Sequence, residues 1–328
     1  MRKTLALTLG AALALVSGLT GCTSAPSSTP EDTAVSSPSV AAHAFTDDSG
    51  ATVEVPGNLS RIVSTSVTLT GTLLALDAPV VGSGGSKPNA AGLDEHGWFM
   101  HWADLAEQRQ VQSLYTSQQV DLEAIMAANP ELIVVAKTGG DSAMDQYEQL
   151  RTIAPTIVID YNNTDWRTVT ERVAEALGTP DVAATVLADF DQKLADTKSR
   201  IAVPQVEVDL GVYSGDGGLA VGLPAAPQGK VLQELGFTIH DSGLTPENGR
   251  TDFAFASKEQ SLQAMTQDTL LLVGNNDKDK AALLEDASFA SLPSVKSGHV
   301  YALGDASFKL DYFAAIDLLE HVKVAFAK

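Results

Sequence analysis

Short runs of aliphatic and β-branched residues alternate along the chain with stretches in which apolar residues recur every three or four positions. From residue 61 onward this alternation is typical of an α/β protein with largely parallel sheets. The clearest predicted strands cover residues 62–65, 80–82, 132–136 and 156–161, then 206–213, 238–240, 270–274 and 300–303. Predicted helices cover residues 165–177, 229–235, 278–286 and 309–326.

A long helix is predicted in the middle of the chain. Thr179 can cap it, and Pro180 suits its first turn because the first helical N–H groups have no partner within the helix. Apolar residues then recur on one side until Pro204. The pattern predicts two Rossmann-like lobes, residues 44–179 and 204–328, joined by a single linking helix at residues 180–203.

The predicted lobes place a ligand site between them. In open α/β sheets, ligands bind outside the carboxyl ends of the strands. Residues 66–71, 83–87 and 137–142 follow predicted strands and are therefore candidate rim loops. A cleft between two such lobes is a natural place for a small ligand.

The amino terminus has the pattern of an export signal. Arg2 and Lys3 precede an apolar run at residues 5–16, which is too short to cross a bilayer about 30 Å thick. Residues 19–22, Leu-Thr-Gly-Cys, resemble a bacterial lipobox, and Cys22 is the only cysteine of the chain. We expect residues 1–21 to be a lipoprotein signal peptide and Cys22 to be lipidated. Residues 22–43, rich in Ser, Thr, Pro and Ala, predict a disordered tether. The protein is then extracytoplasmic and anchored to the cell membrane by lipid.

The chain is acidic, with a formal net charge of -20 at pH 7. Nucleic acid is therefore a poor partner. An anionic ligand would need a local cluster of basic side chains to overcome the general negative field.

Sequence signatures of catalysis and of metal binding are weak. Residues 215–220 match G-x-G-x-x-A as a string, but Gly222, Pro224 and Pro227 interrupt the helix that should follow. Among the histidines only His96 and His101 are close, and a spacing of five suits no common metal motif. The sequence predicts a protein that is not an enzyme and has no metal site or cofactor of its own.

Several segments in colinear order resemble a family of transport proteins. They are residues 70–81, 138–143, 149–156, 233–237 and 300–304. The chain resembles the substrate-binding proteins whose two α/β lobes are joined by one long helix and which serve ABC importers of iron siderophores, haem and cobalamin. Within that group it is most similar to the ferric-enterobactin type.

The resemblance implies a ferric catecholate ligand that carries three negative charges, with its iron already coordinated. Cationic side chains and aromatic rings should then line the cleft. Arg109 matches a family arginine in a loop facing the cleft. Lys309 lies where the family has an arginine, and it keeps the charge but loses the planar fork. Ser113 replaces another family arginine, and Gly222 stands near a family tryptophan, which leaves the identity of the catecholate open.

Further candidates come from their positions along the chain. Trp98, Phe99 and Trp102 lie in a long polar loop, where they either contact ligand or pack locally. Aromatic residues at or just after predicted strand ends are also candidates, and we expect two of these four to contact ligand: Tyr115, Tyr213, Tyr301 and Phe308. Basic residues that could supplement the positive charge are Lys87, Lys137 and Arg250.

The family resemblance also implies partners. Glu123 and Glu259 look like the glutamates that pair with arginines of the membrane permease, which works with its own ATPase. We expect a monomer that delivers a ferric siderophore to this permease. The alternatives are a carrier of hydroxamate siderophore, haem or cobalamin, a surface lipoprotein with hydrolase activity if a Ser, a His and an Asp converge, and a structural or signalling lipoprotein with a closed cleft.

Overall fold

The computed structural model describes residues 41–116, 119–162, 164–215, 218–247 and 250–328. These residues belong to one compact unit, Ser39–Lys328. The expected signal peptide, Cys22 and most of the expected tether lie outside the described residues. No helix within the described ranges combines the length and the apolar character needed to cross a membrane.

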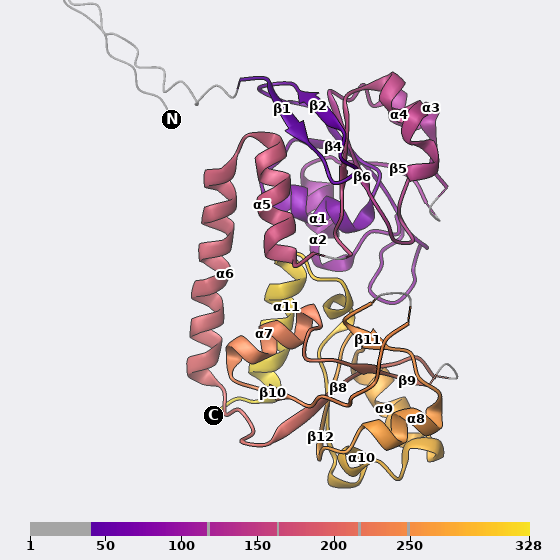
Figure 1. Cartoon of the computed structure of the whole chain (residues 1–328), viewed down its shortest axis with the longest axis vertical. Coiled ribbons are helices and arrows are strands. Elements are labelled where there is room, and N and C mark those ends of the chain that lie inside the picture. The colour runs from indigo at the N-terminus through magenta and orange to yellow at the C-terminus, as the bar shows by residue number, and fades with distance from the viewer. Residues whose placement is uncertain (1–40, 117–118, 163, 216–217, 248–249) are drawn as a thin grey trace, which may run out of the picture. The chain divides into compact units, whose positions relative to one another are not determined.

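The amino-terminal lobe is built on a parallel sheet (Figure 1). Its described strands are β3 (Ile62–Ser64), β4 (Val80–Gly84), β5 (Gln112–Tyr115), β6 (Leu132–Ala136) and β7 (Thr156–Ile159), in the spatial order β5-β4-β3-β6-β7. Every residue of β6 and β7 is buried. Burial on both faces explains why these strands read as continuous aliphatic runs in the sequence.

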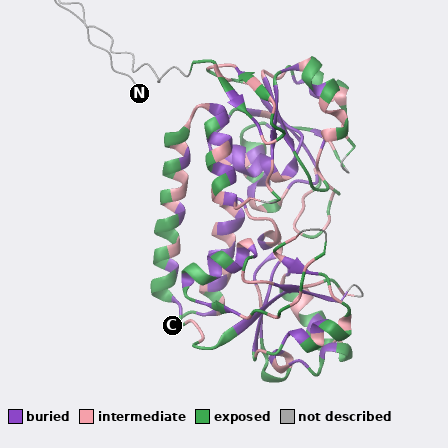
Figure 2. Ribbon diagram, in the orientation of Figure 1, coloured by how far each residue is buried: buried purple, intermediate pink, exposed green. Residues whose placement is uncertain are grey.

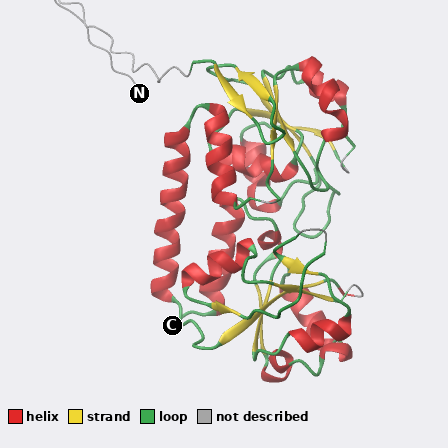
Figure 3. Cartoon of the chain, in the orientation of Figure 1, coloured by secondary structure: helices red, strands yellow, loops and turns green. Residues whose placement is uncertain are grey.

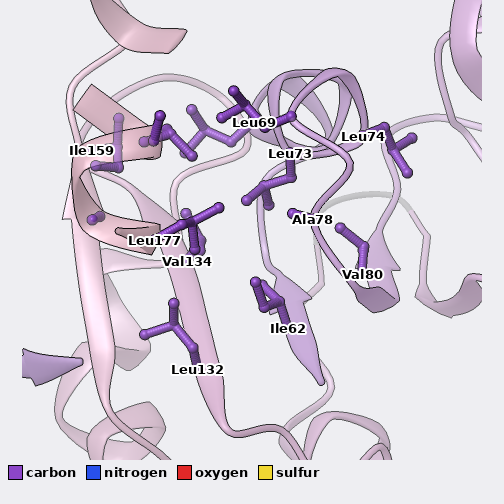
Figure 4. Packing of buried hydrophobic residues seen from close by; sticks show 14 of the residues in the cluster. Ile62, Leu69, Leu73, Leu74, Ala78, Val80, Leu132, Val134, Ile159 and Leu177 are labelled. Atoms are coloured by element: carbon purple, nitrogen blue, oxygen red, sulfur yellow. The ribbon is translucent and has the colours of Figure 1, made fainter. Parts of the chain in front are cut away.

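Helices cover both faces of this sheet (Figure 3). They are α1 (Val67–Ala75), α2 (Met100–Gln108), α3 (Leu122–Ala127), α4 (Tyr147–Ile153) after the short 3₁₀ turn η1 (Met144–Gln146), and α5 (Trp166–Leu177). Leu69 and Leu73 of α1 pack with Ile62 and Leu132 in one core (Figure 4). A second core, which includes Ile125 of α3, lies on the opposite face. The unpredicted hairpin of β1 (His43–Thr46) and β2 (Thr52–Val55) precedes this sheet in the chain, and its Phe45 and Val55 belong to the first core.

The predicted linking helix is present as α6 (Pro180–Arg200). Its buried residues, Ala183, Phe190 and Thr197, recur every seven positions along an otherwise largely exposed helix (Figure 2). Ala183 belongs to the core of the amino-terminal lobe, whereas Phe190 belongs to the core of the carboxyl-terminal lobe. One stiff helix therefore contributes to both cores.

The carboxyl-terminal lobe has a mixed sheet. Its described strands are β8 (Glu207–Tyr213), β9 (Leu219–Gly222), β10 (Thr238–Ile239), β11 (Phe253–Ala254), β12 (Thr269–Leu272) and β13 (His299–Ala302). The order is β11-β9-β8-β12-β13, with β10 also paired to β8. The pairs of β8 with β10 and β12, and of β12 with β13, are parallel as predicted. The unpredicted β9 runs antiparallel to β8 and to β11.

The described helices of this lobe are α7 (Pro227–Leu235), α8 (Lys258–Ala264), α9 (Asp277–Glu285), α10 (Pro293–Ser297) and α11 (Tyr312–Ala325), with the 3₁₀ turns η3 (Ala287–Phe289) and η4 (Asp305–Phe308). Helices α7, α9 and α11 agree with the predicted helices to within a few residues, whereas α8 and α10 were not predicted. The last helix was expected from residue 309 but begins at Tyr312. Asp311 is its N-cap, with a side chain that accepts a hydrogen bond from the Ala314 N–H.

One predicted rim loop is wrong. Residues 66–71 form the cap and first turns of α1, because the Ser66 side chain accepts a hydrogen bond from the Leu69 N–H and starts the helix directly after β3. Ser83 and Gly84 belong to β4. Residues 137–142 do form a loop at the carboxyl end of β6, as expected.

Candidate ligand-binding site

A pocket of about 560 Å³ lies between the two lobes. Its amino-lobe wall comes from the loops that follow β6 and β7, and its carboxyl-lobe wall comes from the start of α7, the segment before β11 and the segment after η4. The lining residues are Thr138, Gly139, Gly140, Asn162, Thr164, Asp165, Ala225, Pro227, Lys230, Arg250, Thr251, Asp252, Phe308 and Lys309. This described lining includes no serine, histidine or cysteine.

A glycine-rich loop, residues 138–140, forms one edge of the pocket. Gly139 has a φ of 105°, and a Cβ there would collide with the Tyr161 hydroxyl. Only glycine fits both this backbone conformation and this close approach. The loop therefore offers its backbone to the pocket without a side chain in the way.

Asp141 fixes this loop to its neighbours. Its Oδ2 accepts hydrogen bonds from Ser66 Oγ at 2.6 Å and from the Thr68 N–H at 3.0 Å. Its Oδ1 accepts a short hydrogen bond from the Tyr161 hydroxyl. Burial and the adjacent Asp141 charge raise the pKa of Tyr161 above its usual value, so this phenol remains a donor.

The opposite wall carries the positive charge. Lys230, Arg250 and Lys309 line the pocket beside two acids, Asp165 and Asp252. A net positive lining is notable in a chain whose formal net charge is -20. Such a surface favours an anionic ligand over a neutral or cationic one.

Each of these bases has a defined neighbour. Arg250 donates to both carboxylate oxygens of Asp252, at 2.9 and 2.7 Å. Lys230 Nζ lies 3.9 Å from Asp165 Oδ2. Lys309 Nζ donates to Asn162 Oδ1 at 2.8 Å. Burial, and then the positive charge of Arg250, lowers the pKa of Lys309 below the usual lysine value.

Phe308 supplies an aromatic surface in the lining. Its ring packs against that of buried Phe253, with the centroids 5.8 Å apart. The side chain of buried Gln228 donates to the backbone carbonyls of Ser307 and Phe308, at 2.7 and 2.8 Å. Gln228 thus holds the segment that presents both Phe308 and Lys309.

Of the predicted ligand contacts, the structure brings Lys309, Phe308 and Arg250 together in the pocket. Lys137 is exposed at the end of β6, with Nζ 3.9 Å from Asp160 Oδ2, and lines a neighbouring pocket of about 400 Å³. Lys87 is exposed in the loop after β4 and is absent from the described lining of the 560 Å³ pocket. Asn162, Asp141 and Gln228 were missed. Asp141 lies in the candidate rim loop at residues 137–142, but no feature of the sequence singled it out there, and nothing in their surroundings marks Asn162 or Gln228.

Arg109 requires a correction. It follows the last residue of α2 and forms an ion pair with Asp77, with Nη2 2.8 Å from Oδ1. Both residues shortly precede strands, β5 and β4, so they lie at the amino edge of the parallel sheet. The pocket loops follow the carboxyl ends. The structure therefore does not place Arg109 at the pocket.

Several aromatic predictions are also corrected, because these rings are held within the lobes. Trp98 is only 1% exposed, and its ring lies 5.9 Å from that of Trp102, so it packs locally. The Tyr213 ring packs edge-on against Phe289, and the Tyr301 ring packs against Phe326. Tyr115 donates its hydroxyl to the Thr65 carbonyl at 2.8 Å. None of these four residues belongs to the described lining of the pocket.

Ser113 and Gly222, the two positions expected to depart from the family pattern, differ in their burial. Ser113 is exposed on β5. Gly222 is buried on β9, where a Cβ would lie 2.7 Å from Leu210 Cγ. Leu210 already fills the space that a larger side chain at position 222 would need.

The remaining predicted residues lie away from the pocket. Glu123 and Glu259 are exposed, each in the first turn of a helix, α3 in one lobe and α8 in the other. Elsewhere, Asp94, His96 and Glu107 each offer one potential ligand atom to a metal, all within 4.8 Å of one another. This group is also outside the described pocket lining.

The fold and the interlobe pocket define a solute-binding protein, and comparison with known proteins gives its family. Residues 62–306 match the Periplasmic binding protein family, to which this chain belongs.

Individual relatives carry more specific names. The chain is 38% identical over 285 residues to the ferric enterobactin-binding periplasmic protein FepB of Escherichia coli O6:H1, which covers 85% of this chain and 89% of that protein. It is 25% identical over 323 residues to the probable siderophore-binding lipoprotein YfiY of Bacillus subtilis, covering 94% of each. The crystal structure of holo-ViuP superposes with a TM-score of 0.78 at 31% identity, covering 87% of this chain and 95% of that one.

Proposed function

We propose that this protein captures a ferric siderophore of the catecholate type outside the cytoplasm and delivers it to the permease of an ABC importer. Family membership supports a role in solute binding. The relative with 38% identity is named for ferric enterobactin, and a second is named as a probable siderophore-binding lipoprotein.

One observation favours an anionic ligand above all others: three basic side chains, against two acidic ones, line the interlobe pocket of a strongly acidic protein. A ferric tris-catecholate carries three negative charges. The bases are concentrated where a ligand would be enclosed, so the attraction acts at short range and with less screening by solvent.

The pocket also offers surface for the catechol rings. Phe308 presents an aromatic ring beside Lys309. The glycine-rich loop at residues 138–140 allows a bulky complex to approach the backbone. Binding of this kind makes and breaks no bond, and α6 limits lobe closure to small hinge or twist motions.

The protein requires no cofactor of its own under this proposal. Iron arrives inside the siderophore with its coordination already complete, so the pocket needs charge and shape rather than metal ligands. The named relatives in the comparison are binding proteins and transport components, not enzymes.

Delivery needs a membrane partner. Glu123 and Glu259 are exposed on separate lobes, as two docking points for arginines of a permease would be. A lipid on Cys22 would keep a monomeric carrier at the membrane face near that permease. Replacing both glutamates by alanine should abolish uptake of the ferric siderophore by cells while leaving binding in solution unchanged.

A neutral hydroxamate siderophore is the second candidate. Two Bacillus subtilis relatives are named iron(3+)-hydroxamate-binding proteins, with 26% and 29% identity over 57% and 49% of this chain. The basic lining favours the catecholate.

Calorimetric titration of the full chain with a ferric tris-catecholate, a neutral ferric hydroxamate, haem and cobalamin tests the choice. We expect the ferric tris-catecholate to bind at least tenfold more tightly than the others. Preference for any other ligand, or no binding of the catecholate, would overturn the proposed ligand.

A further inference from the structure

The ammonium group of Lys309 is held across the pocket by an uncharged side chain. Lys309 belongs to the carboxyl-terminal lobe, yet its Nζ donates to Asn162 Oδ1, in the loop after β7, at 2.8 Å. The other end of the same amide, Asn162 Nδ2, donates to Thr138 Oγ1 at 3.0 Å. The amide is therefore oriented by both contacts, and its carbonyl oxygen faces the ammonium.

Aromatic rings complete the surroundings of this ammonium. Lys309 Nζ lies 5.2 Å from the ring centroid of Tyr161 and 5.9 Å from that of Phe308. Ring faces attract a cation without neutralising its charge. The Tyr161 ring is itself fixed by the hydrogen bond from its hydroxyl to Asp141.

The other lining bases are bound differently. Arg250 makes a bidentate ion pair with Asp252, and Lys230 lies 3.9 Å from the carboxylate of Asp165. Each of these pairs has nearly zero net charge. The third lining base, Lys309, has a neutral hydrogen-bond acceptor. The negative charges of Asp141 and Asp252 act on its ammonium, but neither carboxylate forms an ion pair with it among the described residues.

We propose that Asn162 is a specificity-determining residue: its uncharged carbonyl positions the Lys309 ammonium in the pocket without neutralising it, so the pocket selects anionic over neutral ferric complexes. This inference rests on the proposed function. An aspartate at the same place would put a carboxylate within about 3 Å of the ammonium and cancel the one charge that the other pairs leave uncompensated.

The test compares three variants of the full chain. Asn162→Asp keeps the size of the side chain and adds a negative charge beside Lys309. Asn162→Ala removes the positioning contact and leaves the charge of Lys309 free. Asn129→Asp is the matched control, because Asn129 is exposed in the amino-terminal lobe and absent from the described pocket lining. It adds the same charge away from the site.

We expect Asn162→Asp to weaken binding of a ferric tris-catecholate at least tenfold and to flatten the dependence of its Kd on salt concentration. Asn162→Ala should weaken binding by a smaller factor, about threefold, and keep the salt dependence of the wild type. Asn129→Asp should bind within about twofold of the wild type. Urea unfolding of each variant checks that the fold is intact.

Two results would overturn the inference while the proposed function stands. In one, Asn162→Asp binds the catecholate as well as Asn129→Asp does. In the other, Asn162→Ala loses as much affinity as Asn162→Asp, which would assign Asn162 a role in shape rather than in charge. If the wild-type protein binds no ferric catecholate, the proposed ligand itself fails, and this inference fails with it.

Discussion

The two walls of the pocket differ in what they contribute. The carboxyl-lobe wall supplies all the lining bases and the aromatic ring, at Lys230, Arg250, Lys309 and Phe308. The amino-lobe wall supplies a glycine-rich loop, two threonines, an amide and one acid. Attraction of an anion thus depends mainly on one lobe, whereas its fit and orientation depend on the other. Substitutions on the two walls should therefore affect ligand binding and protein stability in different ways.

The walls are also fixed by different means. Asp141 ties the glycine-rich loop to the start of α1 and to Tyr161 within the same lobe. Gln228 ties the segment of Phe308 and Lys309 to the start of α7. Both anchors hold their segments by hydrogen bonds before any ligand arrives, so the ordering cost at binding is reduced.

Loss of a cation on the carboxyl-lobe wall should have the largest effect. We expect Lys309→Ala to weaken binding of a ferric tris-catecholate by about 1.5 to 3 kcal/mol, because one hydrogen bond to a charged ligand is lost. That is roughly tenfold to more than a hundredfold in Kd. Titration measures it, with Lys296→Ala, an exposed lysine of α10, as the control. Equal affinities for these two variants would place the ligand elsewhere.

A change in the glycine-rich loop of the amino-lobe wall should act mainly through stability. Gly139→Ala forces a Cβ into the Tyr161 hydroxyl, at a residue with a positive φ. We expect the free energy of unfolding, measured in urea, to fall by about 1 to 3 kcal/mol. Gly50→Ala is the control, since Gly50 has a φ of 88° but open space around its Cβ position. The difference between the two isolates the steric clash. If both variants lose the same stability, backbone strain alone accounts for the effect.

The pH dependence of binding sharpens the contrast further. The pKa of Lys309 is lowered, so its ammonium loses its proton at a lower pH than an ordinary lysine does. The affinity for an anionic ligand has its full value below this pKa, where Lys309 is protonated. It declines as the pH rises through the pKa, by about twofold at the pH where half of the Lys309 side chains are neutral. Titrations across the alkaline range measure this. Lys309→Arg should remove the decline, because arginine stays protonated.

The smallest effect is expected at Arg109, on the amino edge of the sheet. Its partner Asp77 is 82% exposed, and exposed ion pairs contribute about 0 to 1 kcal/mol. Arg109→Ala should therefore change ligand affinity less than twofold and lower stability by at most about 1 kcal/mol. Asp77→Asn should have the same effect, because asparagine tolerates the φ of 56° at this position, and the double variant should add nothing further. A tenfold loss of ligand affinity in the Arg109→Ala variant alone would show that Arg109 belongs to the binding site.

The strands were predicted best where burial imposes a simple pattern. The strand at 132–136 was predicted without error, because a strand covered on both faces must be apolar at every position. The hairpin of β1 and β2 and the strands β5, β9 and β11 were missed. They are short, and β9 follows a glycine-rich segment that reads as a turn.

The sequence by itself determined the α/β alternation, the linking helix and the presence of cations after particular strands, since each follows from local periodicity, capping and composition. It identified Phe308 because it follows the last predicted strand, and Lys309 through the resemblance to a family that has an arginine there. Only the tertiary structure decided that Arg109 lies at the amino edge of its sheet, and that Asn162 reaches Lys309, 147 positions away. Contacts of this kind depend on how two lobes meet, and neither periodicity nor composition records which side chains will face each other there.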